Sequence, residues 1–277
     1  MTVAEKKIVK DFYDEVGWKK KDGVFFDTFT FTDRRPVVLE YFARIHQRVR
    51  DYLPARGRFV LDAASGPIPH PEHSVYSEGF DYRLCLDFSL DALQGARLQL
   101  GAKGLYVLAD ITKIPLPDNS VDAAISLHTL YHVPADEQEN ALCEIWRVLK
   151  PKGRAVIVYS WDQHSFLMKL ASPERRINRR IARFLKRNEP QQSSTPAVSF
   201  KLYSYSHDYH RIRQALRKLG PFQLACWRTM STEAQRAYIH DRFHGKQILR
   251  IIAWLEESFP WIFGRLGQFP MFILQKP

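Results

Sequence analysis

The sequence predicts an α/β fold in which helices cover both faces of a mostly parallel sheet. Between residues 57 and 160, short apolar runs alternate with helical patterns, and three of these runs end in an aspartate. Such alternation is typical of doubly wound parallel sheets, whose ligands bind at the carboxyl ends of the strands. We therefore expect a ligand-binding sheet over residues 57–160.

The predicted elements follow one another along this core. Five short apolar runs of the kind found in buried parallel strands lie at 58–64, 82–88, 104–111, 121–130 and 154–160. Two helices are expected, at 89–100 and 135–153, because each has apolar residues along one face. Pro151 and Gly153 are expected to end the second helix.

Three less regular segments surround the core, and all are expected near the carboxyl ends of the strands. The predicted divisions are an N-terminal helical lid at 1–56, the core at 57–160, a basic lid insertion at 161–205, and the closing helix and strands of the core at 206–277, with a helical insertion at about 231–266.

Charge is distributed unevenly along the chain. The net charge is +11, yet residues 58–160 hold nine Lys/Arg against thirteen Asp/Glu, so this core carries −4 and the flanks +15. An anionic partner is therefore expected at the flanks. The three cysteines are isolated, with neither disulfide nor metal spacing, and no secretory signal or long apolar run occurs, so we expect a cytoplasmic protein without a metal.

The loop after the first strand, "VLDAASGPIPHPEHS" (residues 60–74), holds one glycine and three prolines. Dinucleotide loops bind pyrophosphate through backbone N–H groups at a helix N-terminus. Pro67, Pro69 and Pro71 have no N–H, and Asp62 would repel a phosphate. NAD and ATP are therefore poor ligands for this loop.

A cofactor with an ammonium group, a ribose diol and an adenine, but no phosphate, fits these residues better. Asp62 and loop carbonyls could receive the cation, and Gly66 lets a ligand approach the backbone closely. Asp87 is placed to accept from the ribose hydroxyls, and Asp110 from the adenine amine. Each aspartate also has a structural alternative: Asp62 as a turn cap, Asp87 in a helix N-cap segment, and Asp110 as a turn residue.

Four stretches resemble, in order and spacing, motifs of the class I S-adenosylmethionine-dependent methyltransferases: "VLDAASGPI", "LCLDFSLDAL", "LADITKIPLPDNSVDAAISLHTLYHV" and "EIWRVLKPKGRAVIV". The nearest likeness is to the ubiquinone/menaquinone C-methyltransferase subgroup. The resemblance implies a Rossmann-like, seven-stranded sheet with an antiparallel last strand, and S-adenosyl-L-methionine as cofactor. The chain departs from the family where three glycines are frequent, since it has Ala64, Gly66 and Ile68, and the next helix is expected to begin late, near Pro71.

The candidate site residues fall into two groups. Those expected at the cofactor are Tyr13, Asp62, Ala63, Ala64, Ser65, Gly66, Asp87, Phe88, Asp110, Ile111, Leu127 and His128. Those expected at the acceptor are Tyr131, Trp161, Tyr203, Tyr205, His207 and His210. His132 is the candidate general base, because imidazole titrates near neutrality; the alternative is that it caps a helix. For the aromatic cluster at 200–210 the alternative is a hydrophobic seam under a lid.

Residues 175–187 carry seven Lys/Arg, with apolar residues on one side. Such a basic amphipathic helix suits an anionic membrane surface or a phosphate-bearing ligand, and the alternative is a solvated face. The sequence thus predicts a methyltransferase for a small anionic or lipid-linked acceptor, with O-, N- and C-methylation and the oligomeric state left open. Two alternatives remain: a non-catalytic S-adenosylmethionine-binding regulatory protein, and an RNA methyltransferase, although no RNA-binding module accompanies the charge.

Overall fold

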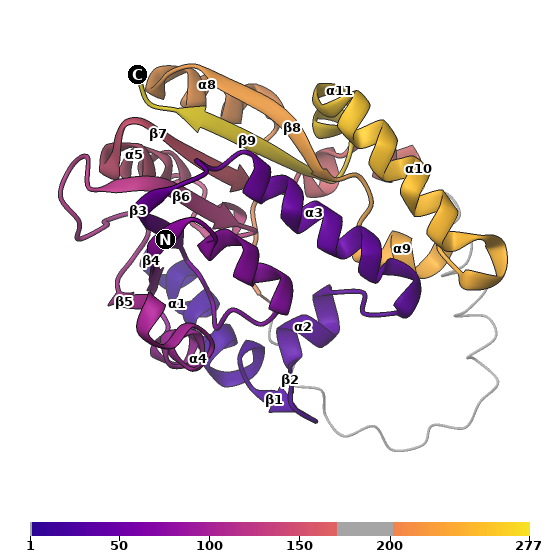
Figure 1. The fold of residues 1–277 in the computed structure, drawn as a ribbon, viewed down its shortest axis with the longest axis horizontal. Helices are drawn as coiled ribbons and strands as arrows, with labels where there is room; N and C mark the ends of the chain where they lie inside the picture. Colours follow the sequence, from indigo (N-terminus) through magenta and orange to yellow (C-terminus); the bar gives the residue numbers. More distant parts are fainter. Residues whose placement is uncertain (1, 171–201) are drawn as a thin grey trace.

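A seven-stranded sheet forms the centre of the molecule (Figure 1). The structure, a computed structural model, describes residues 2–170 and 202–277. In spatial order the sheet is β5-β4-β3-β6-β7-β9-β8. Its strands are β3 (Gly57–Ala63), β4 (Phe80–Asp87), β5 (Gly104–Leu108), β6 (Val121–Leu127), β7 (Leu149–Val158), β8 (Phe222–Arg228) and β9 (Phe269–Gln275). Strand β9 alone runs opposite to the other six strands of this sheet, so the predicted fold is confirmed.

The parallel strands end at one common edge of the sheet. Strand β3 is central, and its Leu61 lies opposite Leu84 of β4 on one side and Ala124 of β6 on the other. Strand β8 runs parallel to β7 because both are antiparallel to β9 between them. Every strand except β9 therefore ends at the edge where ligands bind in open α/β sheets.

Helices cover both faces of the sheet, and each face has its own buried core (Figure 1). The sheet-covering helices are α3 (Leu39–Asp51), α4 (Leu90–Leu100), α5 (Gln138–Val148), α8 (Tyr209–Leu219), α10 (Gly245–Ser258) and α11 (Pro260–Leu266). Helices α5 and α8 pack on one face, and α3 and α10 on the other. In α3, Tyr41, Ile45 and Val49 recur every four residues and are buried, which gives the helix its apolar stripe.

Shorter elements connect these helices and strands. They are α1 (Thr2–Phe12), η1 (Tyr13–Gly17), β1 (Lys20–Lys21), β2 (Val24–Phe25), α2 (Phe26–Phe31), η2 (Pro36–Val38), η3 (Pro71–Ser77), η4 (Gly101–Lys103), η5 (Leu130–His132), η6 (Asp162–His164), α6 (Phe166–Leu170), α9 (Thr232–Tyr238) and η7 (Asp241–Phe243). The basic segment at 175–187 lies outside the described residues. Within those residues, no helix combines the length and apolar character needed to cross a bilayer.

The junction between α5 and β7 differs from the prediction. The helix ends at Val148, and Leu149 already has extended backbone and lies opposite Val121 of β6. Pro151 and Gly153 therefore belong to strand β7 rather than to the end of the helix. The helix stops here because pairing with the sheet buries Leu149 completely.

Candidate active site

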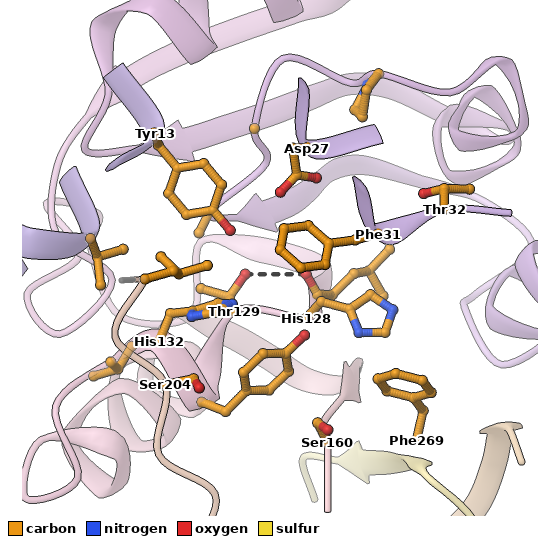
Figure 2. A pocket seen from close by; sticks show the side chains of 18 of the residues that line it. Tyr13, Asp27, Phe31, Thr32, His128, Thr129, His132, Ser160, Ser204 and Phe269 are labelled. Carbon is orange, nitrogen blue, oxygen red and sulfur yellow. Dashed lines mark hydrogen bonds between the residues drawn. The ribbon is translucent and has the colours of Figure 1, made fainter. Parts of the chain in front are cut away.

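A cavity of about 980 Å³ opens at the carboxyl edge of the sheet. Its walls come from the loop after β3, from the ends of β4, β6, β7 and β8, and from α1 and α2. Figure 2 shows Tyr13 and Asp27 facing His128 and His132 across it. The predicted cofactor residues that line the cavity are Tyr13, Asp62, Ala64, Ser65, Gly66, Asp87, Phe88, Asp110, Ile111, Leu127 and His128. Ala63 does not line it, because its side chain points into the sheet core.

The loop after β3 holds three residues in the left-handed region: Ala64 (φ 62°), Gly66 (φ 58°) and Ile68 (φ 54°). These are the positions at which glycine is frequent in the resembled family. Ala64 and Ile68 therefore adopt a backbone conformation that favours glycine, although it costs a residue with a Cβ about 1–2 kcal/mol. Gly66 also has a close neighbour, since a Cβ there would stand 3.1 Å from the ring of Trp18.

Most backbone N–H groups of this loop are already used within the protein. The N–H groups of residues 64 and 65 both donate to the carbonyl of Leu86, at 2.7 and 3.1 Å. The N–H of Gly66 donates to the carboxylate of Asp87 at 2.9 Å. Two of the next three residues are prolines, which have no N–H. The loop therefore lacks the row of free donors with which a dinucleotide loop holds pyrophosphate.

Asp87 ends β4 with its carboxylate at the cavity. Its Oδ2 accepts from Gly66 and its Oδ1 from the N–H of Ser89, each at 2.9 Å. Burial raises the pKa of Asp87 to about 6, and the backbone hydrogen bonds oppose that rise. The helix cap itself is Ser89, whose hydroxyl accepts from Ala92. Because each carboxylate oxygen accepts more than one hydrogen bond, Asp87 can still accept from a diol.

Asp62 has a partner inside the protein, which the sequence did not reveal. The Nε of Arg83 donates to its Oδ2 at 3.0 Å, and the NH2 group of the same guanidinium donates to the same oxygen. Arg83 is 1% exposed and Asp62 3% exposed. Arg83 also donates to the carbonyl of His73, which ties η3 to the sheet. The charge of Asp62 is thus already balanced by Arg83, while its predicted contact with a cofactor ammonium stays a prediction.

Asp110 holds the N-terminal helix to the core. Strand β5 ends at Leu108, two residues before Asp110. The Oδ1 of Asp110 accepts from the N–H and the hydroxyl of Thr112, each at 2.8 Å, which is the turn arrangement given as its alternative. Its Oδ2 accepts from Lys6 of α1 at 2.7 Å, and Lys6 also pairs with Glu137. We refer to these contacts of Lys6 as the α1 latch.

His132 and His128 are uncharged at neutral pH. The Nδ1 of His132 lies 2.8 Å from the carbonyl of Tyr203, so Nδ1 carries the proton and Nε2 is the acceptor. Burial lowers the pKa of His132 to about 4 and that of His128 to about 3. His128 packs edge-on against Trp227 and Phe269. His132 thus has the geometry of a base but little basicity.

Three further histidines line the cavity and were missed by sequence reasoning: His46, His70 and His73. The ring of His73 lies 4.9 Å from that of His46 and 5.1 Å from that of His70. Burial lowers the pKa of His70 to about 4 and holds those of the other two well below their usual value. These neutral rings would not repel a cationic cofactor. No group of His, Cys, Asp and Glu in the described ranges has the arrangement of a metal site.

In the segment 202–207, the side chains that face the cavity are not the predicted ones but those that alternate with them. Leu202, Ser204 and Ser206 line the cavity, whereas Tyr203, Tyr205 and His207 do not. The last three lie beside the start of α5, where the Nε2 of His207 is 2.9 Å from the carbonyl of Ala135. Successive side chains of an extended segment point to opposite sides. The predicted substrate contacts are therefore displaced by one residue.

Trp161 and His210 also lie outside the cavity. Trp161 is 1% exposed, belongs to the core, and donates its indole N–H to the carbonyl of Gly264 at 2.7 Å. Its neighbours Ser160 and Asp162 line the cavity instead. His210 is an exposed residue in the first turn of α8. Of the predicted acceptor residues, only Tyr131 lines the cavity.

Asp27 is a second residue that the sequence did not single out. It lies in α2, and Figure 2 shows its carboxyl group pointing into the cavity. Burial raises the pKa of Asp27 to about 7. A carboxyl group that titrates near neutrality inside a cavity is suited to proton transfer. Its only sequence signal is an acid within the aromatic stretch "FFDTFTF".

Residues 72–157 match the family model described as a methyltransferase domain. This chain carries a class I S-adenosylmethionine-dependent methyltransferase domain. The family predicted from the four motifs is thereby confirmed. The match to the methyltransferase domain begins at Glu72, within the loop after β3, and does not include Ala64, Gly66 and Ile68.

The curated relatives of the methyltransferase domain match only part of the chain. The protein is 34% identical over 110 residues to the ubiquinone/menaquinone biosynthesis C-methyltransferase UbiE of Erwinia tasmaniensis, which covers 37% of this chain and 43% of that protein. Across the curated relatives, the matches span 28% to 60% of the relative's own length.

Solved structures share the fold over most of the chain. The DhpI structure, a complex with S-adenosylhomocysteine (SAH), is similar with a TM-score of 0.59 at 15% identity, over 100% of both chains. The [4+2]-cyclase SpnF is similar with a TM-score of 0.52 at 17% identity, over 89% of this chain and 85% of its own. Since one neighbour is named for a different reaction, the fold by itself does not identify the chemistry.

Proposed function

We propose that this protein is an S-adenosylmethionine-dependent methyltransferase of a small acceptor that is anionic or lipid-linked. One observation carries the proposal: the loop after β3 uses its N–H groups internally, while the Asp87 carboxylate beside it lines the cavity. This arrangement suits a ligand with a ribose diol and no phosphate. When bound, such a cofactor supplies a methyl group on a positively charged sulfur.

The residues around the cavity fit a cationic cofactor. Asp87 would accept from the ribose hydroxyls while the loop holds its carboxylate in place. The stacked rings of Tyr13 and Trp18, with centroids 4.7 Å apart, would cover the ligand from the N-terminal segment. The neutral imidazoles of His128 and His132 add no positive charge that would oppose the sulfonium.

Positioning and exclusion of water are the main contributions of this chain to methyl transfer, because the reaction is a single in-line displacement. An acceptor hydroxyl or amine also needs to lose a proton. Asp27 is the stronger candidate for the proton acceptor, since its pKa of about 7 suits that task and the pKa of about 4 of His132 does not. His132, predicted as the base from sequence, remains a candidate through its unprotonated Nε2.

Calorimetry with SAH, NAD and ATP tests the cofactor. We expect SAH to bind and both phosphate-bearing ligands to bind far more weakly; NAD binding tighter than SAH would contradict the proposal. Incubation with methyl-labelled cofactor and either a metabolite extract or total RNA, followed by mass spectrometry, tests the activity. Label in a small molecule supports the proposal, label in RNA replaces the acceptor class, and binding without transfer to any molecule would support a non-catalytic regulatory protein.

A further inference from the structure

Strand β8 ends at the cavity with an irregular step. Cys226 lies opposite Pro270 and Arg228 opposite Phe269, so two steps along β8 correspond to one step along β9. A bulge of this kind bends the strand and redirects side chains, and it is common beside active sites. Here the two consecutive residues Trp227 and Arg228 both line the cavity.

Arg228 is a buried cation held by neutral groups. It is 5% exposed, and its guanidinium carbon lies 5.2 Å from the ring centroid of Trp227 and 4.7 Å from that of Phe269. Its NH1 donates to the side-chain oxygen of Gln235 and its NH2 to the hydroxyl of Thr232, each at 3.1 Å. These contacts fix the orientation of the guanidinium but supply no negative charge.

The charge of Arg228 has no counter-charge of its own. Among the described residues, no carboxylate forms an ion pair with it, and its Nε has no hydrogen-bond partner. The two carboxylates that act on it at longer range are already engaged, Glu256 with Arg48 and Asp33 with Arg35. Burial lowers the pKa of the Arg228 guanidinium, yet an arginine remains charged at neutral pH.

The other arginines at the cavity differ from Arg228 in this respect. Arg83 is neutralised by Asp62. Arg236 donates to the backbone carbonyls of residues 29, 30 and 32, and it is exposed. A buried cation without a negatively charged partner is costly to a folded protein, so an anionic ligand beside Arg228 would compensate its charge.

We infer that Arg228 binds a carboxylate or phosphate group of the acceptor at the β8 side of the cavity. The inference rests on the proposed function, and it assigns recognition of the acceptor's anionic group to one residue. The planar guanidinium matches both groups, since each offers two oxygens to parallel N–H donors. In spatial order β8 lies four strands from β3, so an anion here would leave the loop and Asp87 to the cofactor.

The test compares probes that share a phenyl ring and differ in the charge of the attached group, and benzoate and benzamide also have nearly the same shape. Benzoate, phenyl phosphate and the neutral benzamide are titrated into the SAH-saturated protein, with intrinsic tryptophan fluorescence as one reporter and calorimetry as the second. We expect at least one of the two anions to bind at least about tenfold more tightly than benzamide, a factor equivalent to 1.4 kcal/mol. The tighter of the two anions identifies the acceptor group as carboxylate or phosphate.

Three variants complete the test. Arg228→Met should reduce the preference for the anion to within about twofold, and Arg228→Lys should retain part of it, because lysine keeps the charge without the planar fork. Arg250→Met is the matched control: Arg250 pairs with Glu40 at the surface, away from the cavity, and the preference should be unchanged. Urea unfolding of Arg228→Met should have its midpoint at the wild-type concentration or higher, because the substitution removes an uncompensated buried charge.

The inference is overturned if wild-type protein binds benzamide as tightly as both anions, or if Arg228→Met keeps the preference. It is also overturned if Arg228→Met unfolds at a clearly lower urea concentration, since Arg228 would then be a structural cation. The failure of the proposed function would look different. In that case SAH itself would not bind, while the anion preference could still be measured in the cofactor-free protein.

Discussion

Replacing Arg83 by methionine should strongly destabilise the protein, because it leaves the Asp62 carboxylate buried without a partner. The guanidinium makes two hydrogen bonds to Asp62 and a third, of 2.6 Å, to the carbonyl of His73. Breaking one side of a buried ion pair costs about 3–5 kcal/mol. Domains of ordinary stability unfold with about 5–15 kcal/mol, so Arg83→Met should lose a large part of the total.

The double variant Arg83→Met/Asp62→Leu separates the lost pair from the lost packing. With both charges removed no unpaired carboxylate remains, and we expect most of the stability to return, to within about 1–2 kcal/mol of the wild type. Urea unfolding followed by circular dichroism and by tryptophan fluorescence measures both variants. The control Arg250→Met removes a pair whose side chains are 60% and 57% exposed, so its urea midpoint should stay close to that of the wild type.

The reasoning is refuted if Arg83→Met costs no more than the surface control, or if the double variant is as unstable as the single one. The first result would mean that Asp62 finds another partner or reaches solvent. The second would mean that the shape of Arg83, rather than its charge, holds η3 and β4 together.

Three further predictions concern the cavity. Asp87→Ala should weaken SAH binding by about 1.5–3 kcal/mol, or about 10- to 150-fold, because hydrogen bonds to a charged group are lost. If calorimetry gives an unchanged Kd for a folded variant, Asp87 does not belong to the cofactor site. The folded-state pKa of Asp27, about 7, lies above the ordinary value of 3.8, so the folded protein binds this proton more tightly and loses stability as the pH rises from about 4 to about 7. Asp27→Asn should flatten that part of the profile of Tm against pH, whereas parallel profiles would show that Asp27 does not titrate as described. Gly66→Ala should cost about 1–2 kcal/mol and shift the emission of Trp18, since φ is +58° and the ring is 3.1 Å from the new Cβ; an unchanged Tm would show that the loop relaxes freely.

Sequence reasoning succeeded where a residue's position follows from the end of a parallel strand. Asp87 and Gly66 could be assigned to one edge of the sheet because apolar runs alternate with helices, and that order sets where each strand ends. By the same rule Arg228, the last residue of β8, lies at this edge. The fold and the phosphate-free ligand needed no further information.

Prediction from the sequence failed where a residue's role depends on a neighbour from another part of the chain. The pairing of Asp62 with Arg83 requires the register of β3 against β4, which an apolar pattern does not specify. In the segment 202–207, alternation is certain for extended backbone, but its phase depends on which side chains meet α5. Asp27 enters the cavity because α2 folds back over the sheet edge, and no local pattern encodes that contact.

Two ion pairs of similar chemistry in this molecule differ in how deeply their side chains are buried. Water is excluded from the pair of Arg83 and Asp62, so this pair holds β3 and β4 together. In the α1 latch, the side chains of Lys6 and Asp110 are 28% and 38% exposed, and contacts of this kind contribute about 1 kcal/mol or less each. Val9 and Phe12 of α1 are 4% and 5% exposed, so burial of these side chains, as well as the α1 latch, holds this helix in place. The contacts of Lys6 can therefore break and re-form at little cost in free energy, whereas the buried pair of Arg83 and Asp62 stays closed.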